Sequence, residues 1–192
     1  MRKKRILLGV SGSISAYKAA DLTNELTKHG FEVDVLMTKN SQTFITPLTL
    51  QSLSKRIVHT DVMQEVAPEK INHIELAREA DLLVIAPATA NIIGKLANGL
   101  ADDLLTTVAL AIKPHVPKLI APAMNTNMYQ HPLTQRNLHI LKEIGYQEVH
   151  PREALLACGD YGPGALATIE TLVAAVEATL LTTYSQENNT ND

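Results

Sequence analysis

The sequence predicts an α/β protein with a doubly wound parallel sheet. Short, almost continuous apolar runs alternate along the chain with longer amphipathic stretches. Strands that are buried on both faces of a parallel sheet have this apolar character, and the helices that connect them have the amphipathic one. Turns of small residues join the two kinds of segment, and Gly30 and Gly145 stand where two of the predicted helices should stop.

The first three elements form a βαβ unit. Arg5–Val10 is a short apolar run and predicts a buried strand. Ser15 can cap a helix that we expect from about Ala16 to His29. Glu32–Met37 predicts the second strand. Because a helix of about a dozen residues separates the two strands, we expect them to be parallel.

The same pattern recurs along the rest of the chain. It predicts a Rossmann-like or flavodoxin-like three-layer αβα fold, with one domain over residues 1–184 and a disordered polar tail over 185–192. Residues 38–70 give little signal, apart from a short helix over 47–54. The remaining predicted strands cover 81–87, 116–122 and 147–150, and the remaining helices cover 74–80, 90–98, 102–112, 132–144 and 169–181.

Composition narrows the classes of function. The 192 residues suffice for one domain with a substantial core, and a net charge of −3 argues against a nucleic-acid partner. The apolar run behind the basic N-terminus is too short for a signal peptide, and no segment approaches a membrane span. The single cysteine, Cys158, excludes an intrachain disulfide and a cysteine-based metal cluster. We therefore expect a cytoplasmic protein that binds neither nucleic acid nor membrane.

The turn Gly12-Ser13-Ile14 is a candidate phosphate site. It lies between a strand and a helix N-terminus, where exposed N–H groups and the helix dipole favour an anion. The spacing from Gly9 to Gly12 lacks the third glycine of a dinucleotide fingerprint, and Asp34 lies inside the second strand, so a mononucleotide fits better. A plain tight turn explains these residues about equally well.

Two further loops follow strand ends at the same edge of the sheet. Thr89 is a good N-cap, which is explanation enough for that residue, but the Asn91 amide would face a heterocycle or ribityl hydroxyls. The loop over 122–129 carries two further ligand-binding candidates, Asn125 and Met128. A purely structural interpretation is that the asparagines bond to the local backbone and the methionines fill apolar space.

His73 and Cys158 are the candidate reactive side chains. His73 stands near the start of a predicted helix and is one of seven histidines, so its position alone does not select it as a base. Cys158 lies in the glycine-rich stretch 157–164, which predicts a mobile flap that closes over a ligand. The alternative for a lone cysteine is a small buried residue.

Five motifs, in order, resemble one family over about residues 4–181. The motifs are Gly12-Ser13-Ile14-Ser15-Ala16-Tyr17-Lys18, His73-Ile74-Glu75-Leu76, Ala86-Pro87-Ala88-Thr89-Ala90-Asn91 with Gly94-Lys95-Leu96-Ala97, Pro122-Ala123-Met124-Asn125 with Met128, and Ala157-Cys158-Gly159. In these motifs the chain is similar to the homo-oligomeric flavin-containing cysteine decarboxylases, whose members act on phosphopantothenoylcysteine or on peptidyl cysteine.

The resemblance implies a site. It implies His73 as the catalytic base, Cys158 as a late proton donor, and Asn125 and Met128 as substrate-binding residues. It also implies a trimer or a larger assembly such as a dodecamer, with the flavin at a subunit interface. The FMN-binding residues that it implies are Gly12, Ser13, Ile14, Thr38, Thr89, Ala90, Asn91, Ile92 and Ala123.

The resemblance also implies a reaction. Phosphopantothenoylcysteine would become phosphopantetheine, in coenzyme A biosynthesis, through oxidation of the thiol carbon to a thioaldehyde, CO2 loss and re-reduction of the enethiolate. A separate phosphopantothenate–cysteine ligase would act upstream. The alternatives are a peptidyl-cysteine decarboxylase and, more remotely, a non-catalytic phosphatase-regulating flavoprotein. Two departures bear on the substrate: Ala165-Leu166 stand where the family commonly has Arg-Met, and Tyr129 stands where it often has Trp.

Overall fold

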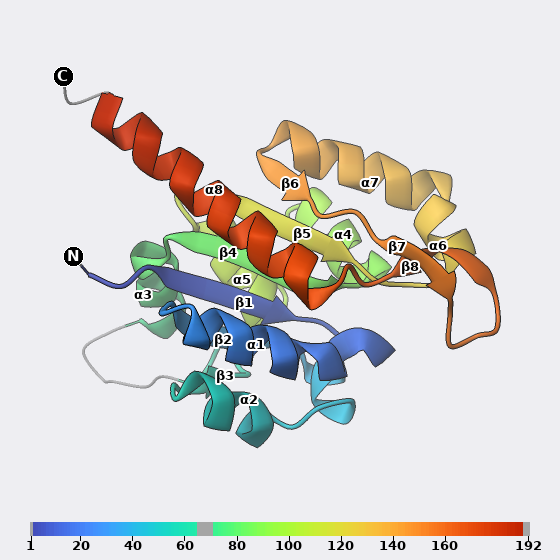
Figure 1. Ribbon diagram of the computed structural model, residues 1–192, viewed down its shortest axis with the longest axis horizontal. Coiled ribbons are helices and arrows are strands. Elements are labelled where there is room, and N and C mark those ends of the chain that lie inside the picture. The colour runs from blue at the N-terminus through green and yellow to red at the C-terminus, as the bar shows by residue number, and fades with distance from the viewer. Residues whose placement is uncertain (1, 65–70, 190–192) are drawn as a thin grey trace.

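The computed structural model describes residues 2–64 and 71–189 and has a six-stranded, wholly parallel sheet at its centre (Figure 1). The strand order is β3-β2-β1-β4-β5-β6. Strands β2 and β3 are added on one side of β1, and β4, β5 and β6 are added on its other side, so the order of addition reverses between β1 and β4. Ligands of such sheets bind at this reversal, beyond the carboxyl ends of the strands. The strands are β1 (Arg5–Val10), β2 (Glu32–Met37), β3 (Val58–His59), β4 (Leu82–Ala88), β5 (Lys118–Pro122) and β6 (Tyr146–Glu148).

Helices cover both faces of this sheet and complete a three-layer αβα fold. Successive side chains of a strand point to opposite faces, so Ile6 and Leu8 of β1 belong to one apolar core and Leu7 belongs to the other. One face packs on α1 (Ala19–Lys28), α2 (Pro47–Ser54) and α8 (Ile169–Asn189). The other face packs on α3 (Asn72–Glu79), α4 (Ala90–Ala97), α5 (Leu104–Ala111) and α7 (Pro132–Glu143).

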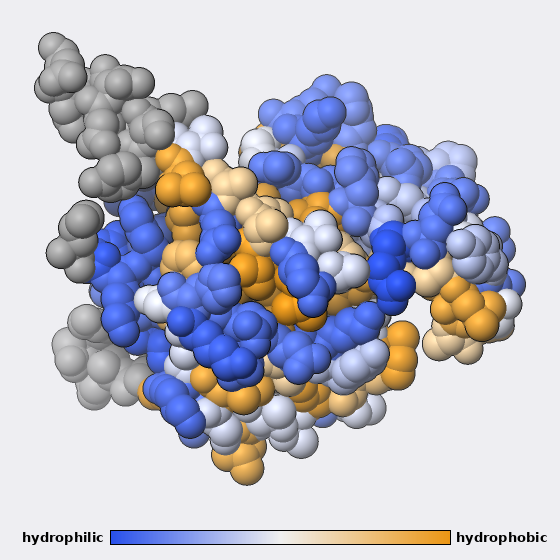
Figure 2. All heavy atoms as spheres, in the orientation of Figure 1, coloured by the Kyte–Doolittle hydropathy of each residue, from blue (hydrophilic) through white to orange (hydrophobic). Residues whose placement is uncertain are grey.

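A two-stranded hairpin stands apart from the main sheet. Its antiparallel strands are β7 (Arg152–Leu155) and β8 (Tyr161–Ala165), and it projects beyond the carboxyl ends of the parallel strands, beside the short helix α6 (Thr126–Gln130) (Figure 1). The sequence predicted a flap here but no strands, because Gly-Pro-Gly lacks the alternation of a half-buried strand. Leu155 and Tyr161 are largely exposed, and Figure 2 shows apolar surface gathered at the hairpin.

The first predicted helix begins differently from the prediction. A short 3-10 helix, η1 (Ile14–Lys18), precedes α1, and the cap is Ser13 rather than Ser15. Ser13 has an extended backbone, and its hydroxyl oxygen accepts a hydrogen bond from the Ser15 N–H at 3.2 Å. The helix therefore starts directly after the Gly12 turn, which leaves Ser13 at the edge of the candidate site.

The C-terminal boundary is also different. Helix α8 continues to Asn189, whereas we predicted a helix over 169–181 and a disordered tail over 185–192. Each added residue of an existing helix makes one backbone hydrogen bond without a new nucleation cost, and Gln186 and Glu187 are good helix formers. The polar composition therefore did not decide the structure of 185–189, and residues 190–192 lie outside the described part.

The segment after β2 contains two short elements that the sequence did not predict. Thr38 caps a second 3-10 helix, η2 (Lys39–Thr43), and the two-residue strand β3 pairs with β2. Helix α2 has the bounds that we predicted. Within residues 2–64 and 71–189, no helix combines the length and apolar character needed to cross a membrane, and no group of three or more metal-ligating side chains is present.

Candidate functional site

The loops that follow β1, β2 and β4 line one cleft at the carboxyl edge of the sheet. Most of the residues that we predicted to bind a cofactor lie together there. Because the cleft sits where the strand order reverses, the fold itself gathers these distant segments. The predicted residues on its wall are Gly12, Thr38, Thr89, Ala90, Asn91, Ile92 and Met128, and the additional ones include Ser11, Asn40 and Lys95.

Gly12 allows two of these loops to approach each other closely. A Cβ at this position would stand 2.5 Å from the Asn40 Cβ, a distance that no side chain tolerates. The absence of a side chain leaves a narrow, backbone-lined recess between the turn after β1 and η2. A phosphate, which is bound by backbone N–H groups, fits such a recess.

Ser11 ties the turn after β1 to the loop after β4. Its hydroxyl donates to the Pro87 carbonyl at 2.7 Å and accepts from the Thr89 N–H at 3.0 Å. The oxygens of Ser13, Thr38 and Thr89 accept hydrogen bonds as helix caps, so the protons of these hydroxyls remain available to an anion. The sequence predicted Thr89 as a cap and named Ser13 and Thr38 only as cofactor-binding residues, and it missed Ser11.

Two lysines, Lys39 and Lys95, line this cleft, and Lys95 is already paired with carboxylates. Its ammonium lies 2.6 Å from an Asp102 carboxylate oxygen and 3.0 Å from one of Asp103. The hydrogen bond to Asp102 raises the pKa of Lys95, and the same bond lowers the pKa of the Asp102 carboxyl. This arrangement holds the start of α5 against α4.

A second cleft begins at the same turn and is closed on its far side by the hairpin. Ser13 and Ile14 line it from the main body, and Cys158 lines it from the loop between β7 and β8. Figure 2 shows a notch between the hairpin and the body at this place. Since Gly12 lines the first cleft and Ser13 lines the second, the two clefts meet at this turn.

Asn125, Cys158 and Asp160 form a hydrogen-bonded cluster in the second cleft. The Asn125 amide donates to the Cys158 sulfur at 3.2 Å and to an Asp160 carboxylate oxygen at 2.8 Å. The Cys158 thiol lies 3.4 Å from the same oxygen of Asp160, to which it donates. The structure thus brings two predicted residues together across 33 positions of sequence and adds Asp160, which we did not predict.

The hairpin is fixed to the Asn125 loop at Gly164. The Met124 N–H donates to the Gly164 carbonyl at 2.9 Å, and a Cβ on Gly164 would lie 2.2 Å from the Met124 oxygen. Of the two residues that depart from the family pattern, Ala165 lines the second cleft, whereas Leu166 is buried in the main core. Only Ala165 is therefore placed to change contacts with a ligand.

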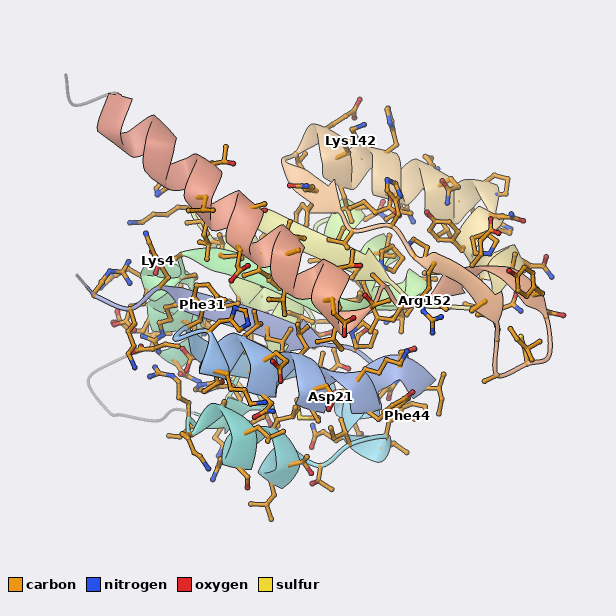
Figure 3. All side chains as sticks on the ribbon, viewed as in Figure 1. Lys4, Asp21, Phe31, Phe44, Lys142 and Arg152 are labelled. Carbon is orange, nitrogen blue, oxygen red and sulfur yellow. The ribbon has the colours of Figure 1, made fainter. Side chains whose placement is uncertain are left out.

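Two basic side chains flank the second cleft. Lys18 comes from η1 and Arg152 from β7, and Figure 3 shows Arg152 extending from the hairpin toward the start of α1. Burial lowers the pKa of Lys18, the positive charge of Arg152 lowers it further, and Asp21 acts in the opposite sense. Two cations that repel each other in this way favour an anion between them. The sequence reading assigned no role to either residue.

Two predicted site residues do not line these clefts. His73 occupies the first turn of α3, where its Nδ1 is buried and has no hydrogen-bond partner among the described residues. Ala123 is almost completely buried, and its N–H donates to the Ala88 carbonyl, so its side chain is not open to a cofactor. Within one copy of the chain, His73 is therefore separate from the cluster around Cys158.

Comparison with known proteins places these features in a family. The model of the family described as Flavoprotein matches residues 1–181. The chain belongs to this flavoprotein family.

Similar flavoproteins include single-function and bifunctional proteins. A Streptococcus mutans protein named "Probable phosphopantothenoylcysteine decarboxylase" is 55% identical over 177 residues, which are 92% of this chain and 99% of that protein. The Bacillus subtilis "Coenzyme A biosynthesis bifunctional protein CoaBC" is 48% identical over 92% of this chain. The match covers 43% of CoaBC, so the chain spans less than half the length of that relative.

Solved structures of similar flavoproteins share the whole fold. A PPC decarboxylase variant in complex with pantothenoylaminoethenethiol is 38% identical, with a TM-score of 0.83, over 93% of this chain and 98% of that one. The FMN-dependent cysteine decarboxylase SpaF is 33% identical, with a TM-score of 0.82, over 94% of this chain and 97% of that one. Both confirm the predicted three-layer α/β architecture.

Proposed function

We propose that this flavoprotein is an FMN-dependent phosphopantothenoylcysteine decarboxylase of coenzyme A biosynthesis. The observation that carries the proposal is the Asn125–Cys158–Asp160 cluster, which stands next to the turn that the two clefts share. A thiol and an amide are thereby held within reach of a cofactor in the first cleft. The names of the S. mutans relative and of the PPC decarboxylase structure support the same reaction.

The residues of the first cleft fit FMN. The recess at Gly12 would take its phosphate, and the loop from Thr89 to Ile92 would face its ring system. When bound, FMN supplies a two-electron acceptor that takes a hydride and later returns it. Thr38 would contribute a hydroxyl from the other side of the recess. The buried side chain of Ala123 limits that residue to a backbone contact.

Asn125 and Cys158 would act on the substrate. Direct loss of CO2 from a cysteine carboxylate would leave an unstabilised carbanion. A thioaldehyde forms when the thiol carbon loses a hydride and the sulfur loses a proton. This group accepts the electron pair that CO2 leaves behind. The Asn125 amide, which now donates to Asp160, would turn to the substrate carboxylate and the neighbouring carbonyl. After CO2 leaves, the hydride returns to the thiol carbon and Cys158 gives a proton to the carbon that carried the carboxylate.

Lys18 and Arg152 favour a phosphorylated substrate over a peptide. They lie on the same cleft as Cys158. Burial and, after it, the charge of Arg152 lower the pKa of Lys18, and a phosphate between the two cations would offset their repulsion. A peptide C-terminus offers one carboxylate, which is the group that decarboxylation needs, and supplies no second anion. Phosphopantothenoylcysteine therefore carries both anionic groups: a phosphate for Lys18 and Arg152, and the carboxylate that is lost as CO2.

His73 would serve as the base from a neighbouring copy. It does not line either cleft of its own chain, and its buried Nδ1 has no partner among the described residues. We propose a homo-oligomer, either a trimer or a dodecamer, in which the site forms between copies. A separate phosphopantothenate–cysteine ligase would supply the substrate in the cytoplasm.

Mass spectrometry of phosphopantothenoylcysteine incubated with the purified, FMN-loaded protein tests the proposal. We expect a product lighter by one CO2. With Cys158→Ser the product should be lighter by one CO2 and two hydrogens, because CO2 is released but the final reduction stalls. If the substrate stays intact while a peptide with a C-terminal cysteine loses CO2, the protein is a peptidyl-cysteine decarboxylase. If the purified protein cannot be loaded with FMN, the flavin assignment is wrong.

A further inference from the structure

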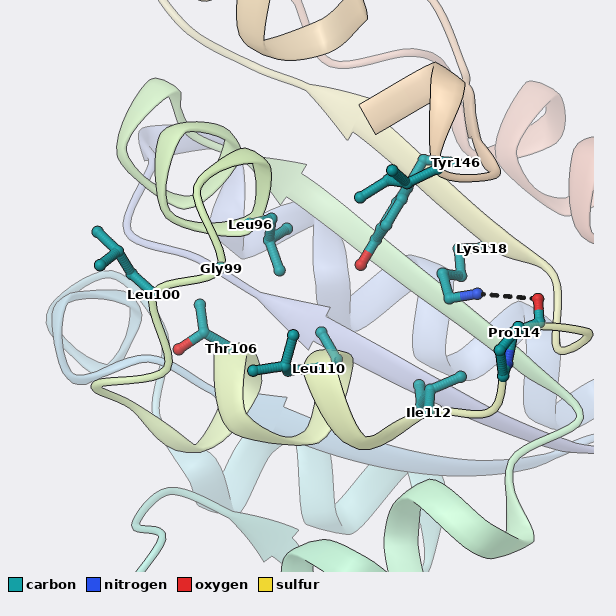
Figure 4. Close-up of a pocket in the computed structure, with 11 residues that line it drawn as sticks. Leu96, Gly99, Leu100, Thr106, Leu110, Ile112, Pro114, Lys118 and Tyr146 are labelled. Carbon is teal, nitrogen blue, oxygen red and sulfur yellow. Dashed lines mark hydrogen bonds between the residues drawn. The ribbon is translucent and has the colours of Figure 1, made fainter. Parts of the chain in front are cut away.

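A third cavity lies at the opposite edge of the sheet from the two clefts. It has a volume of about 210 Å³ and shares no lining residue with either of them. Lys118 and Tyr146, which begin β5 and β6, form one side, and the end of α4 and the length of α5 form the other (Figure 4). The proposed reaction uses none of these residues.

Most of the wall is apolar. Leu96, Leu100, Leu110, Ile112 and Ile144 face the cavity. Leu100, Leu110 and Ile144 are 55%, 65% and 56% exposed, so the cavity is open to solvent on their side. A dry apolar cavity of about 150 Å³ in another protein holds one benzene molecule, so this space accommodates a single ring with a small substituent.

The Tyr146 hydroxyl points into this cavity (Figure 4). Tyr146 is only 7% exposed, and its hydroxyl has no hydrogen-bond partner among the residues that the structure describes. Burial alone raises the pKa of Tyr146 to about 12, which fits a phenol that keeps its proton and has no acceptor. The hydroxyl borders the open cavity and is not among the fully buried atoms that lack a partner, so an acceptor on a ligand in the cavity can reach it.

Lys118 places a positive charge at the same wall. It is 7% exposed, and its ammonium donates to the carbonyls of Val116 at 2.9 Å and Pro114 at 3.4 Å. It lies 5.9 Å from the centre of the Tyr146 ring. No carboxylate of the described residues pairs with it, and burial lowers its pKa. A buried ammonium without a counter-ion favours an anionic ligand.

We propose that this cavity binds a small carboxylate with an apolar, single-ring body. The carboxylate accepts a hydrogen bond from the Tyr146 hydroxyl within the field of the Lys118 ammonium. The ring packs against Leu96 and Leu110. The site is separate from the reaction, so the inference does not depend on the proposed function.

Calorimetric titration of the FMN-loaded protein with benzoate and with uncharged benzamide tests the site. Benzoate should bind saturably and more tightly than benzamide. Tyr146→Phe should weaken both ligands about fivefold, because both lose one hydrogen bond. Lys118→Met should weaken benzoate about tenfold or more and change benzamide little, because the lost interaction is with charge. Lys113→Met removes an exposed lysine outside the cavity and serves as the matched control.

Three outcomes would overturn the inference. The first is no saturable binding of benzoate, which would also be the result if another copy of the chain covered the cavity. The second is equal affinity for benzoate and benzamide in the unaltered protein, a comparison that needs no variant to fold. The third is equal weakening of benzoate by Lys113→Met and Lys118→Met, which would reduce the effect to general surface charge.

Discussion

Cys158 and His73 differ in how the fold places them. The Cys158 sulfur accepts a hydrogen bond from Asn125 at 3.2 Å, in the cleft that adjoins the proposed flavin site. His73 lies on α3 and lines neither cleft. If both side chains act on one substrate molecule, they must come from different copies of the chain.

Mixing two inactive variants tests this consequence. His73→Asn and Cys158→Ser should each fail to complete the reaction. When the two are co-expressed, some sites combine the intact His73 of one copy with the intact Cys158 of another. We expect these mixed assemblies to recover up to about a quarter of the wild-type turnover, because neither variant disturbs the fold around the other residue. Turnover of phosphopantothenoylcysteine, normalised to bound FMN, is the measurement.

The control is the double variant that carries both substitutions. Co-expressed with either single variant, it leaves one of the two side chains absent from every site, and no activity should return. If the two single variants together are as inactive as each alone, His73 and Cys158 belong to the same copy or His73 is not the base. Activity of His73→Asn by itself would remove His73 from the mechanism.

Single residues were predictable where their role is local. Gly12 and Ser13 follow a buried strand, and Thr89 precedes a helix, so position in the sequence was enough to assign them to the carboxyl edge. Asp160 joins the site only because the hairpin folds back onto Asn125. No local pattern distinguishes this aspartate from a surface residue.

The β7–β8 hairpin is the element that completes the second cleft. It carries Cys158, Asp160 and Arg152, and it is fixed to the Asn125 loop by the bond from Met124 to Gly164. At Gly164 the φ angle is +145°, and a Cβ would stand 2.2 Å from a backbone oxygen. Only glycine permits both the conformation and this close approach.

Gly164→Ala should therefore detach the hairpin while leaving the flavin site intact. The clash and the backbone strain together should reduce the free energy of unfolding by about 2 kcal/mol. FMN binding should persist, because Gly12 and Thr89 lie on other elements. KM for the substrate should rise at least about tenfold, since Asn125, Cys158 and Asp160 no longer meet. Steady-state kinetics and limited proteolysis within residues 152–165 measure the two effects.

Gly30→Ala is the matched control for this variant. Its φ is +89°, so it has a comparable backbone penalty, but no atom lies within 4 Å of the added Cβ. It should lose stability without a change in KM. If Gly164→Ala keeps the wild-type KM and resists protease equally well, the contact with Met124 does not hold the hairpin.

At the scale of elements, the sequence was informative for strands with a continuous apolar run. The bounds of β1 and β2 were predicted as observed, because these strands are buried on both faces. The hairpin strands and β3 were missed: the former are rich in glycine and largely exposed, and the latter has only two residues. The end of α8 was wrong because polar composition was taken as disorder.

The whole molecule explains a residue that is ambiguous in sequence. Asp34 lies in the second strand, where a dinucleotide-binding fold has its acidic residue at the strand end. In the structure Asp34 is buried and forms ion pairs with Arg5 of β1 and with Arg56, which lies two residues before β3. It therefore joins neighbouring strands and does not contact a ribose, and this distinction depends on the strand order, which the sequence does not encode locally.

His59, in the edge strand β3 that pairs with β2, makes the free energy of unfolding depend on pH. Burial lowers the pKa of His59 below its usual value of 6.5, with Arg5 and Arg56 acting in the same sense and Asp34 in the opposite one. The Asn72 amide nitrogen lies 3.1 Å from His59 Nδ1, which accepts a hydrogen bond only while it carries no proton. The folded protein thus favours neutral His59.

The free energy of unfolding should consequently fall as the pH drops below about 6.5. Above that pH both states are neutral, and His59 contributes no slope. Below it the unfolded chain takes the proton first, so acid favours unfolding until the pH passes the lowered folded-state pKa.

In His59→Gln, whose side-chain oxygen can still accept from Asn72, urea denaturation between pH 7 and 5 should show a smaller loss of stability than in the wild type. His139→Gln, which alters an exposed histidine, should retain the wild-type slope. Equal slopes in all three proteins would mean that His59 takes its proton as easily in the folded state as in the unfolded one.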